Sequence, residues 1–141
     1  MPFTFQLDIV SAEKSIFSGS VDSLVASGEL GELGINAGHA PLLTSLKPGT
    51  VRVKDKEGNE ETFYVSGGML EVQPHVTTIL ADTAARADDV DEAAAIAAKE
   101  AAEAAMADQN SEIEYSRAAV ELAEAVAQLR TLQSIRKKAG K

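Results

Sequence analysis

The sequence has 141 residues, of which 45% are hydrophobic and 25% are charged, and its formal net charge is −9. This length allows one ordinary domain or a small domain with an appendage, and the absence of cysteine excludes disulfides, a thiolate nucleophile and zinc–thiolate sites. The acidic balance argues against a general nucleic-acid-binding protein, and two histidines are too few for a histidine-rich metal centre.

No stretch of the sequence predicts a membrane span or a secretory signal. No apolar run approaches the ~20 residues that cross a bilayer. Residues 1–5, MPFTF, lack the basic segment and the apolar core of a signal peptide. We therefore expect a soluble protein that works in the cytosol.

The composition of the chain changes near residue 85. Nine of the ten glycines lie between Gly19 and Gly68, and all four prolines lie at or before Pro74. Residues 90–107, in contrast, contain ten alanines in eighteen positions, which is typical of helix. We expect a strand-rich domain over residues 1–85 and a helical domain over residues 86–141.

The first unit has the pattern of short strands separated by turns. Apolar residues alternate with polar ones from Phe3 to Ile9, as in a half-buried strand, and Ser18-Gly19-Ser20 has the composition of a turn. Residues 55–59, DKEGN, predict the turn of a hairpin. Together these patterns indicate an antiparallel sandwich or barrel. Its expected core residues are Phe3, Phe5, Leu7, Val51, Val53, Phe63, Val65 and Ile79.

The glycine-rich segment 31–43 is the most unusual stretch of this unit. It lacks the spacing of a phosphate-binding loop, and Pro41 stands where such a loop would lead into a helix, so we do not expect nucleotide binding there. His39 has no Ser, Cys or carboxylate at the spacing of a triad or metal site, which favours a structural or interface histidine over a general base. Gly67-Gly68 is typical of a bulge or a sharp corner between strands.

The second unit has the pattern of two antiparallel helices. Asp88 or Asp89 is expected to cap the first helix, and the acids around it suit the positive end of the helix dipole better than they suit a metal site. After a polar break, Ser111-Glu112-Ile113-Glu114 has the form of a capping box, which predicts the start of the second helix.

The two helices differ in what they can bury. The first must pack through alanine, which buries little apolar area at ~25 cal/mol per Å². The second carries an apolar stripe, so we expect a hairpin that is held weakly. The stripe consists of Leu122, Val126, Leu129 and Leu132.

Charge is segregated along this unit. Residues 86–114 contain nine acidic and two basic residues, whereas residues 125–141 contain five basic residues and none that are acidic. The end of the chain is therefore either a solvated helix terminus that complements its own dipole or a surface for an acidic partner. We call its basic residues the basic tip: Arg130, Arg136, Lys137 and Lys138.

Several segments, in order and in spacing, resemble the successive signatures of the epsilon subunit of bacterial F-type ATP synthase. The resemblance covers the whole chain, including the two-helix tail, and several long motifs in register make it highly specific. The matching segments are GELGI (31–35), GHAPLLT (38–44), LKPG (46–49), VSGGMLEV (65–72), LADTA (80–84), AAVELA (118–123) and AQLR (127–130).

This resemblance implies an α+β fold, a ten-stranded antiparallel sandwich followed by a helical hairpin. It implies a non-catalytic subunit of the central stalk, bound to the gamma subunit and to the polar loops of the c-subunit ring, with no cofactor, no metal and no nucleic acid. The protein would be peripheral, on the cytoplasmic face of the bacterial plasma membrane, and would meet the membrane only through the complex. Residues at the interface with gamma and the c ring would be Glu29, Glu32, Leu33 and His39, of which we expect Glu32 and Leu33 to be exposed.

The resemblance also implies a regulatory tail. In family members the hairpin opens, its helices extend along gamma into the catalytic alpha and beta subunits, and ATP hydrolysis is inhibited. The stripe and the basic tip would then be the inhibitory residues, with the tip against an acidic segment of beta. Some members bind ATP through aliphatic-Asp-x-x-Arg-Ala, but here Asp91 is followed by Ala94 in place of the arginine, so we do not expect nucleotide binding by the tail.

Two other functions are compatible with the residues alone. One is a free-standing sandwich that binds a small molecule and dimerises through its helical tail. The other is an enzyme centred on His39. Co-purification with a membrane-associated ATPase separates the stalk subunit from both.

Overall fold

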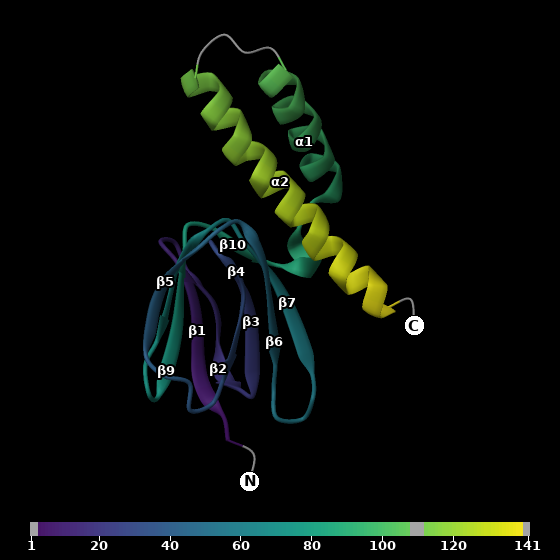
Figure 1. The fold of residues 1–141 in the computed structure, drawn as a ribbon. Helices are drawn as coiled ribbons and strands as arrows, with labels where there is room; N and C mark the ends of the chain where they lie inside the picture. Colours follow the sequence, from purple (N-terminus) through teal and green to yellow (C-terminus); the bar gives the residue numbers. More distant parts are fainter. Residues whose placement is uncertain (1–2, 108–111, 140–141) are drawn as a thin grey trace.

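The computed structural model describes residues 3–107 and 112–139, with side chains described as far as Arg136. These residues form ten strands, one short 3-10 turn and two helices, arranged as a sandwich with a hairpin at one end (Figure 1). The strands are β1 (Phe5–Ser11), β2 (Ser15–Val21), β3 (Ser23–Gly28), β4 (Gly31–Asn36), β5 (Leu42–Leu46), β6 (Gly49–Lys54), β7 (Glu60–Val65), β8 (Gly68–Val72), β9 (Val76–Ala81) and β10 (Ala84–Arg86). They are followed by η1 (Ala87–Asp89), α1 (Glu92–Ala107) and α2 (Glu112–Ala139).

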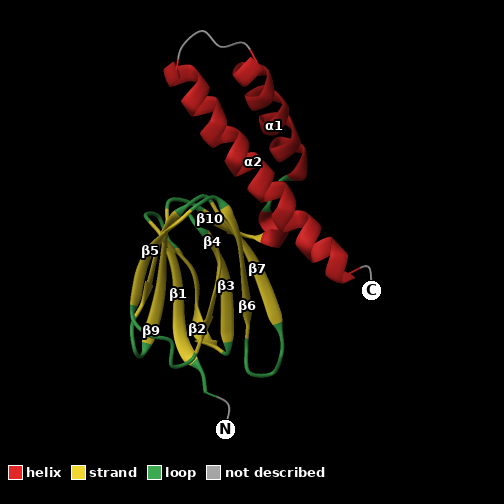
Figure 2. Cartoon of the chain, viewed as in Figure 1, coloured by secondary structure: helices red, strands yellow, loops and turns green. Residues whose placement is uncertain are grey.

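The strands form one continuous hydrogen-bonded path folded into two layers (Figure 2). The order is β10-β7-β6-β3-β5-β8-β9-β1-β2, with β4 paired to β3 beside this path. The pairs are antiparallel except for β1 with β9, which is parallel and which the sequence pattern did not predict. The α+β class, the sandwich of about ten strands and the helical tail are confirmed. The last strand, β10, crosses the boundary that we placed between residues 85 and 86.

The core is built by alternation along the strands. In β1, Leu7 and Ile9 are fully buried and their polar neighbours face outward. The predicted core residues of β6, β7 and β9 are also buried, and the Phe63 ring packs edge-to-face on Phe17 at a centroid distance of 5.6 Å. Phe3 is the exception: it lies before β1, is 71% exposed and takes no part in the core, because no neighbouring strand covers it.

Two local predictions were wrong. Ser18-Gly19-Ser20 is not a turn but lies within β2, where Gly19 pairs with Leu7. Ser18 and Ser20 are on the exposed face, and Gly19 lies on the other face beside the Phe17 ring. Neither Asp88 nor Asp89 caps α1, because both belong to η1, and α1 starts only after this turn. The cap is Asp91, whose carboxylate accepts a hydrogen bond from the Ala94 amide at 3.1 Å. The predicted capping box begins at Ser111, which lies outside the described residues.

Gly67 and Gly68 form the expected corner between strands. Both have positive φ angles, 123° and 140°, which are strained for any residue with a Cβ. A Cβ on Gly68 would lie 2.0 Å from the Leu80 carbonyl oxygen, so the backbones of β8 and β9 approach too closely for a side chain. The pair is therefore explained by packing of the sheet.

The helical hairpin packs through alanine, as predicted. On α1, Ala95 and Ala102 are each 1% exposed. On α2, Ala118, Ala125 and Leu132 are buried and recur every seven residues, which places them on one face of the helix. The small side chains bring the two helices close together but bury little area, so the hairpin has little hydrophobic stabilisation of its own.

Candidate functional site

The tail contacts the sandwich mainly through α2. Among the described elements, α2 packs on β6, β7 and η1, whereas α1 packs on α2 (Figure 1). The C-terminal part of α2 passes beside β7, and the N-terminal part stands with α1 beyond the end of the sheet. The contact between α2 and the sheet therefore decides whether the tail stays folded on the sandwich.

Small and polar side chains dominate this contact. Ala127 is 4% exposed and Thr131 is completely buried. The Thr131 hydroxyl lies 2.9 Å from the Thr50 hydroxyl of β6, and it donates a hydrogen bond to the Ala127 carbonyl at 2.8 Å. Neither threonine was predicted from the sequence, because a single threonine in a strand or in a helix carries no pattern that marks a contact.

Tyr64 of β7 lies beneath the same helix. Burial raises the pKa of its hydroxyl to about 12; a hydrogen bond with Gln128 acts against this rise, and the Glu124 carboxylate adds to it. The phenol therefore stays protonated at neutral pH and is a polar partner for α2. The run Phe63-Tyr64-Val65 at the end of β7, where alternation with polar residues was expected, was a weak signal in the sequence that both faces of this strand are covered.

Acidic groups face one another at this contact. Glu124 of α2 is partly buried, and burial is the main reason why its pKa is raised; the nearby carboxylates of Glu121 and Asp82 raise it further. Asp82 lies between β9 and β10, so the repulsion acts between the tail and the sandwich. Ionised Glu124 therefore opposes docking of the tail.

Two ion pairs hold the segments around this contact. Arg136 near the end of α2 pairs with Glu92 at the start of α1, and this pair links the two helices at the open end of the hairpin, away from the segment that joins them. Arg86 of β10 pairs with Glu61 of β7 and lies 5.4 Å from the centre of the Phe63 ring. The second pair ties the last strand to the sheet, and the first holds the start of α1 against the end of α2.

The predicted inhibitory residues lie in different environments. Leu122, Val126 and Arg130 line a groove of about 500 Å³ between α2 and the end of the sandwich. Leu132 is buried, Leu129 is half-buried, and the Arg136 side chain is 62% exposed. Lys137 and Lys138 belong to α2, but their side chains lie outside the described residues. The stripe is thus mostly covered in the folded tail.

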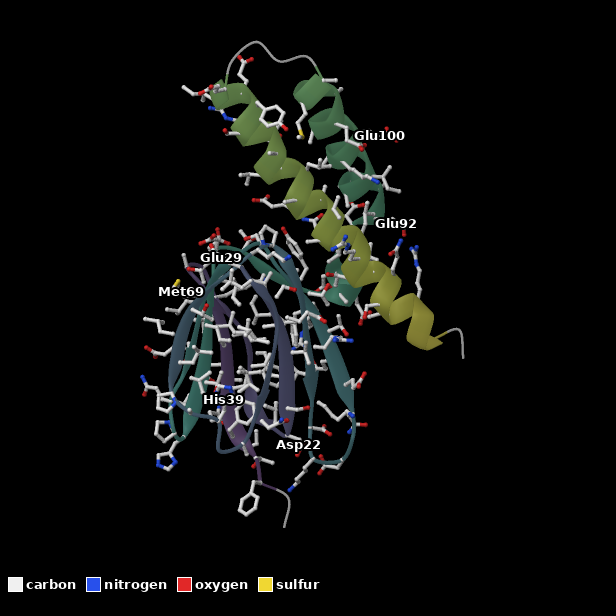
Figure 3. The ribbon with its side chains drawn as sticks, viewed as in Figure 1. Asp22, Glu29, His39, Met69, Glu92 and Glu100 are labelled. Carbon is white, nitrogen blue, oxygen red and sulfur yellow. The ribbon has the colours of Figure 1, made fainter. Side chains whose placement is uncertain are left out.

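Of the predicted interface residues, Glu29, Glu32 and Leu33 share the β3–β4 hairpin, and His39 lies apart from them. Glu29 lies in the turn between β3 and β4 at the hairpin end, whereas His39 lies towards the opposite end (Figure 3). Glu32 is exposed and pairs with Arg52 at 3.5 Å. The prediction that Leu33 is exposed was wrong, because it packs against the core from β4. Leu30, at the tip of the turn, is fully exposed instead, and no pattern in the sequence distinguished it from Leu33.

His39 has the surroundings of a structural residue. Its ring Nδ1 lies 2.7 Å from the Ala40 carbonyl, and its backbone amide donates to Asn36. Within the described residues, no group of three or more His, Asp or Glu side chains is arranged to hold a metal ion. None of the described helices has the length and hydropathy of a membrane span.

An apolar strip crosses the outer face of the sheet. Met69 pairs with Leu80 on β9, and Leu80 is in register with Val10 on β1. Leu43 lies on the same face of β5, diagonal to Met69, because Met69 itself pairs with Ser45. Leu43 is 64% exposed, and Leu80 is 54% exposed. We call Val10, Leu43, Met69 and Leu80 the outer strip. Its signal in the sequence was apolar residues on both faces of β5 and β9, where one polar face was expected.

Both parts of the chain match families of one enzyme. Residues 4–87 match the family described as ATP synthase, Delta/Epsilon chain, beta-sandwich domain, and residues 88–133 match its long alpha-helix domain. The chain is 60% identical to the ATP synthase epsilon chain of Nitrosococcus oceani, over 99% of this chain and all of that relative. It is 63% identical to the epsilon chain of Chromohalobacter salexigens, over 96% of each.

The fold also matches solved structures. A chain of the Euglena gracilis mitochondrial ATP synthase, in a structure of OSCP, F1 and the c-ring, superposes with a TM-score of 0.84 at 22% identity, over 94% of this chain and 83% of that one. A chain in the central stalk and c-ring structure of the Tetrahymena thermophila enzyme gives 0.62 at 13% identity, over 91% and 96%. At these identities the likeness shows the shared fold.

Proposed function

The chain belongs to the delta/epsilon chain family of ATP synthase, and from this membership we propose how its surfaces serve the enzyme. It is a non-catalytic subunit of the central stalk of an F-type ATP synthase. The observation that carries this function is the match of both parts of the chain, over nearly its full length, to epsilon chains. This match favours a stalk subunit over a free-standing small-molecule-binding sandwich or an enzyme centred on His39.

The outer strip is the surface for the gamma subunit. Exposed apolar side chains that share one face of the sheet are costly in water, and covering them with a partner recovers the hydrophobic free energy. Replacing Leu80 with Asp should weaken capture of gamma without unfolding the sandwich, because the side chain points outward. The control is Val76→Asp, a half-buried position at the other end of the same strand.

The turn between β3 and β4 is the surface for the c ring. Leu30 is fully exposed at its tip, and the acids Glu29 and Glu32 flank it, so the turn offers an apolar contact inside a polar rim. Replacing Glu32 with Lys should reduce attachment to the membrane sector while the melting temperature of the isolated chain stays within a few degrees. Full attachment of this variant contradicts the placement. Through this contact the protein is peripheral to the cytoplasmic face of the bacterial plasma membrane.

The tail regulates ATP hydrolysis by leaving the sandwich. Its contact with the sheet is narrow and partly polar, and like charges oppose it at Glu124, so the folded and extended arrangements differ by only a few kcal/mol. On extension, the stripe and the basic tip become available to the alpha and beta subunits. The test is ATP hydrolysis by the assembled enzyme with and without the tail: removal should raise the rate.

A further inference from the structure

The hydroxyl pair between α2 and β6 is, like the Tyr64–Gln128 hydrogen bond, a directional contact of the tail with the sheet. Thr131 is completely buried, and its hydroxyl reaches across to Thr50, a residue 81 positions away in the chain. The neighbouring buried residue of α2 is Ala127. Its methyl group fixes neither the rotation of the helix about its axis nor the position of the helix along the sheet. The hydroxyl pair is directional and fixes both.

The direction of the hydrogen bonds follows from the number of protons. A hydroxyl group has one proton and can accept through its lone pairs. Thr131 uses its proton towards the Ala127 carbonyl at 2.8 Å, so it receives the proton of Thr50 at 2.9 Å. The chain of bonds therefore runs from the sheet, through the Thr131 oxygen, into the helix backbone.

This direction makes the contact easy to break and to remake. When α2 leaves the sheet, Thr131 keeps its bond to Ala127, because that bond lies within the helix. Thr50 exchanges Thr131 for water. Only one hydrogen bond is lost, and no buried group is left without a partner, so the pair favours the folded tail without making it permanent.

We propose that the Thr50–Thr131 pair is the latch of the folded tail, and that its strength sets how readily the tail is released. This proposal rests on the regulatory role given to the tail above. The simpler interpretation is a buried helix threonine that is satisfied by its own backbone. The two differ sharply for valine, which has nearly the same shape: a latch is broken by Thr131→Val, whereas a space-filling residue is not.

A double-mutant cycle separates the two. Thr50→Val removes the bond between the two hydroxyls. Thr131→Val removes that bond and the bond to Ala127, but the latter lies within the helix and is lost from docked and open tails alike, so each single change weakens docking by the one bond across the contact. The double change replaces the polar pair with two methyl groups in contact, which is close to neutral for docking. Mere loss of packing would instead make the double variant at least as open as the two singles combined.

The chain contains no cysteine, so a single introduced cysteine is the one thiol that can be alkylated, and its rate of alkylation measures opening of the tail. Ala127→Cys places a thiol beneath the docked helix, and its alkylation rate in the intact isolated chain reports the fraction of open tail. In this background, Thr131→Val and Thr50→Val should each raise the rate by about threefold to tenfold. Thr131→Ser, which keeps the hydroxyl, and the double valine variant should stay within about twofold of the parent.

Thr78→Val is the matched control, because Thr78 lies on β9 and is half-buried away from α2. Its rate should equal that of the parent. An unchanged rate in Thr131→Val, or a double variant as open as the singles combined, overturns the latch. If Thr131→Val opens the isolated chain but ATP hydrolysis by the assembled enzyme does not fall, the latch stands and the inhibitory role of the tail is contradicted.

Discussion

Replacing Glu92 with Gln should make the subunit a stronger inhibitor. Glu92 pairs with Arg136 and closes the open end of the hairpin, so its neutralisation weakens the folded tail and leaves every residue of the basic tip intact. The loss of favourable interaction with the α1 dipole is the same in folded and extended tails, because the helix is present in both. The change therefore acts on the equilibrium between them.

The exposure of the pair limits its magnitude. The Arg136 side chain is 62% exposed and the Glu92 side chain 37%, so solvent screens the attraction, and a pair of this kind contributes about 0.2–1 kcal/mol. The ratio of extended to folded tails should rise by about 1.4-fold to 5-fold. The effect should shrink as salt is added.

The assay is ATP hydrolysis by the assembled enzyme at low and high salt. Glu100→Gln is the matched control: it removes the same charge from the same helix, and within the described residues Glu100 has no ion-pair partner (Figure 3). We expect Glu92→Gln to lower hydrolysis relative to Glu100→Gln at low salt and to match it at high salt. Equal rates at low salt would refute a role for this pair in holding the tail.

Three further outcomes are expected. Neutralising Arg130, Lys137 and Lys138 to Gln, with Arg136 left to pair with Glu92, should raise hydrolysis by the assembled enzyme at low salt; unchanged inhibition would assign the inhibitory contact to the apolar stripe. The pKa of Glu124 is raised above its ordinary 4.5 in the folded tail, so docking is strongest at low pH and weakens as the pH rises through the raised pKa of the folded state. The distance between labels on β9 and α2 measures docking, and Glu124→Gln should remove its pH dependence. Isothermal titration in magnesium buffer should give no ATP binding by the tail, because Ala94 replaces the arginine and Asp91 is already used as the cap of α1; a millimolar or tighter site would contradict this.

The fold was predictable where one local rule decided the outcome. Alternation in β1 identified Phe5 and Leu7 as core, and the alanine content of residues 90–107 identified a hairpin that packs through alanine. Phe3 was misplaced because alternation does not show where the covering strand stops. Asp91, rather than Asp88, caps α1 because η1 delays the helix by one turn, which no residue pattern marks.

The site was less predictable than the fold because its contacts are tertiary. Thr50 and Thr131 meet only when β6 and α2 are in place, and neither residue is unusual in its own element. Leu33 and Leu30 show the same limit. Both are leucines of one hairpin, yet Leu33 packs against the core from β4, whereas Leu30 is exposed at the tip of the turn.

Removal of the tail tests the central claim most directly. A chain that ends after Asp89 keeps β10 and η1 on the sandwich and loses both helices. In the assembled enzyme it should retain its attachment to the stalk and give a higher rate of ATP hydrolysis than the full chain. An attached shortened chain with an unchanged or lower rate would contradict a regulatory role for the tail.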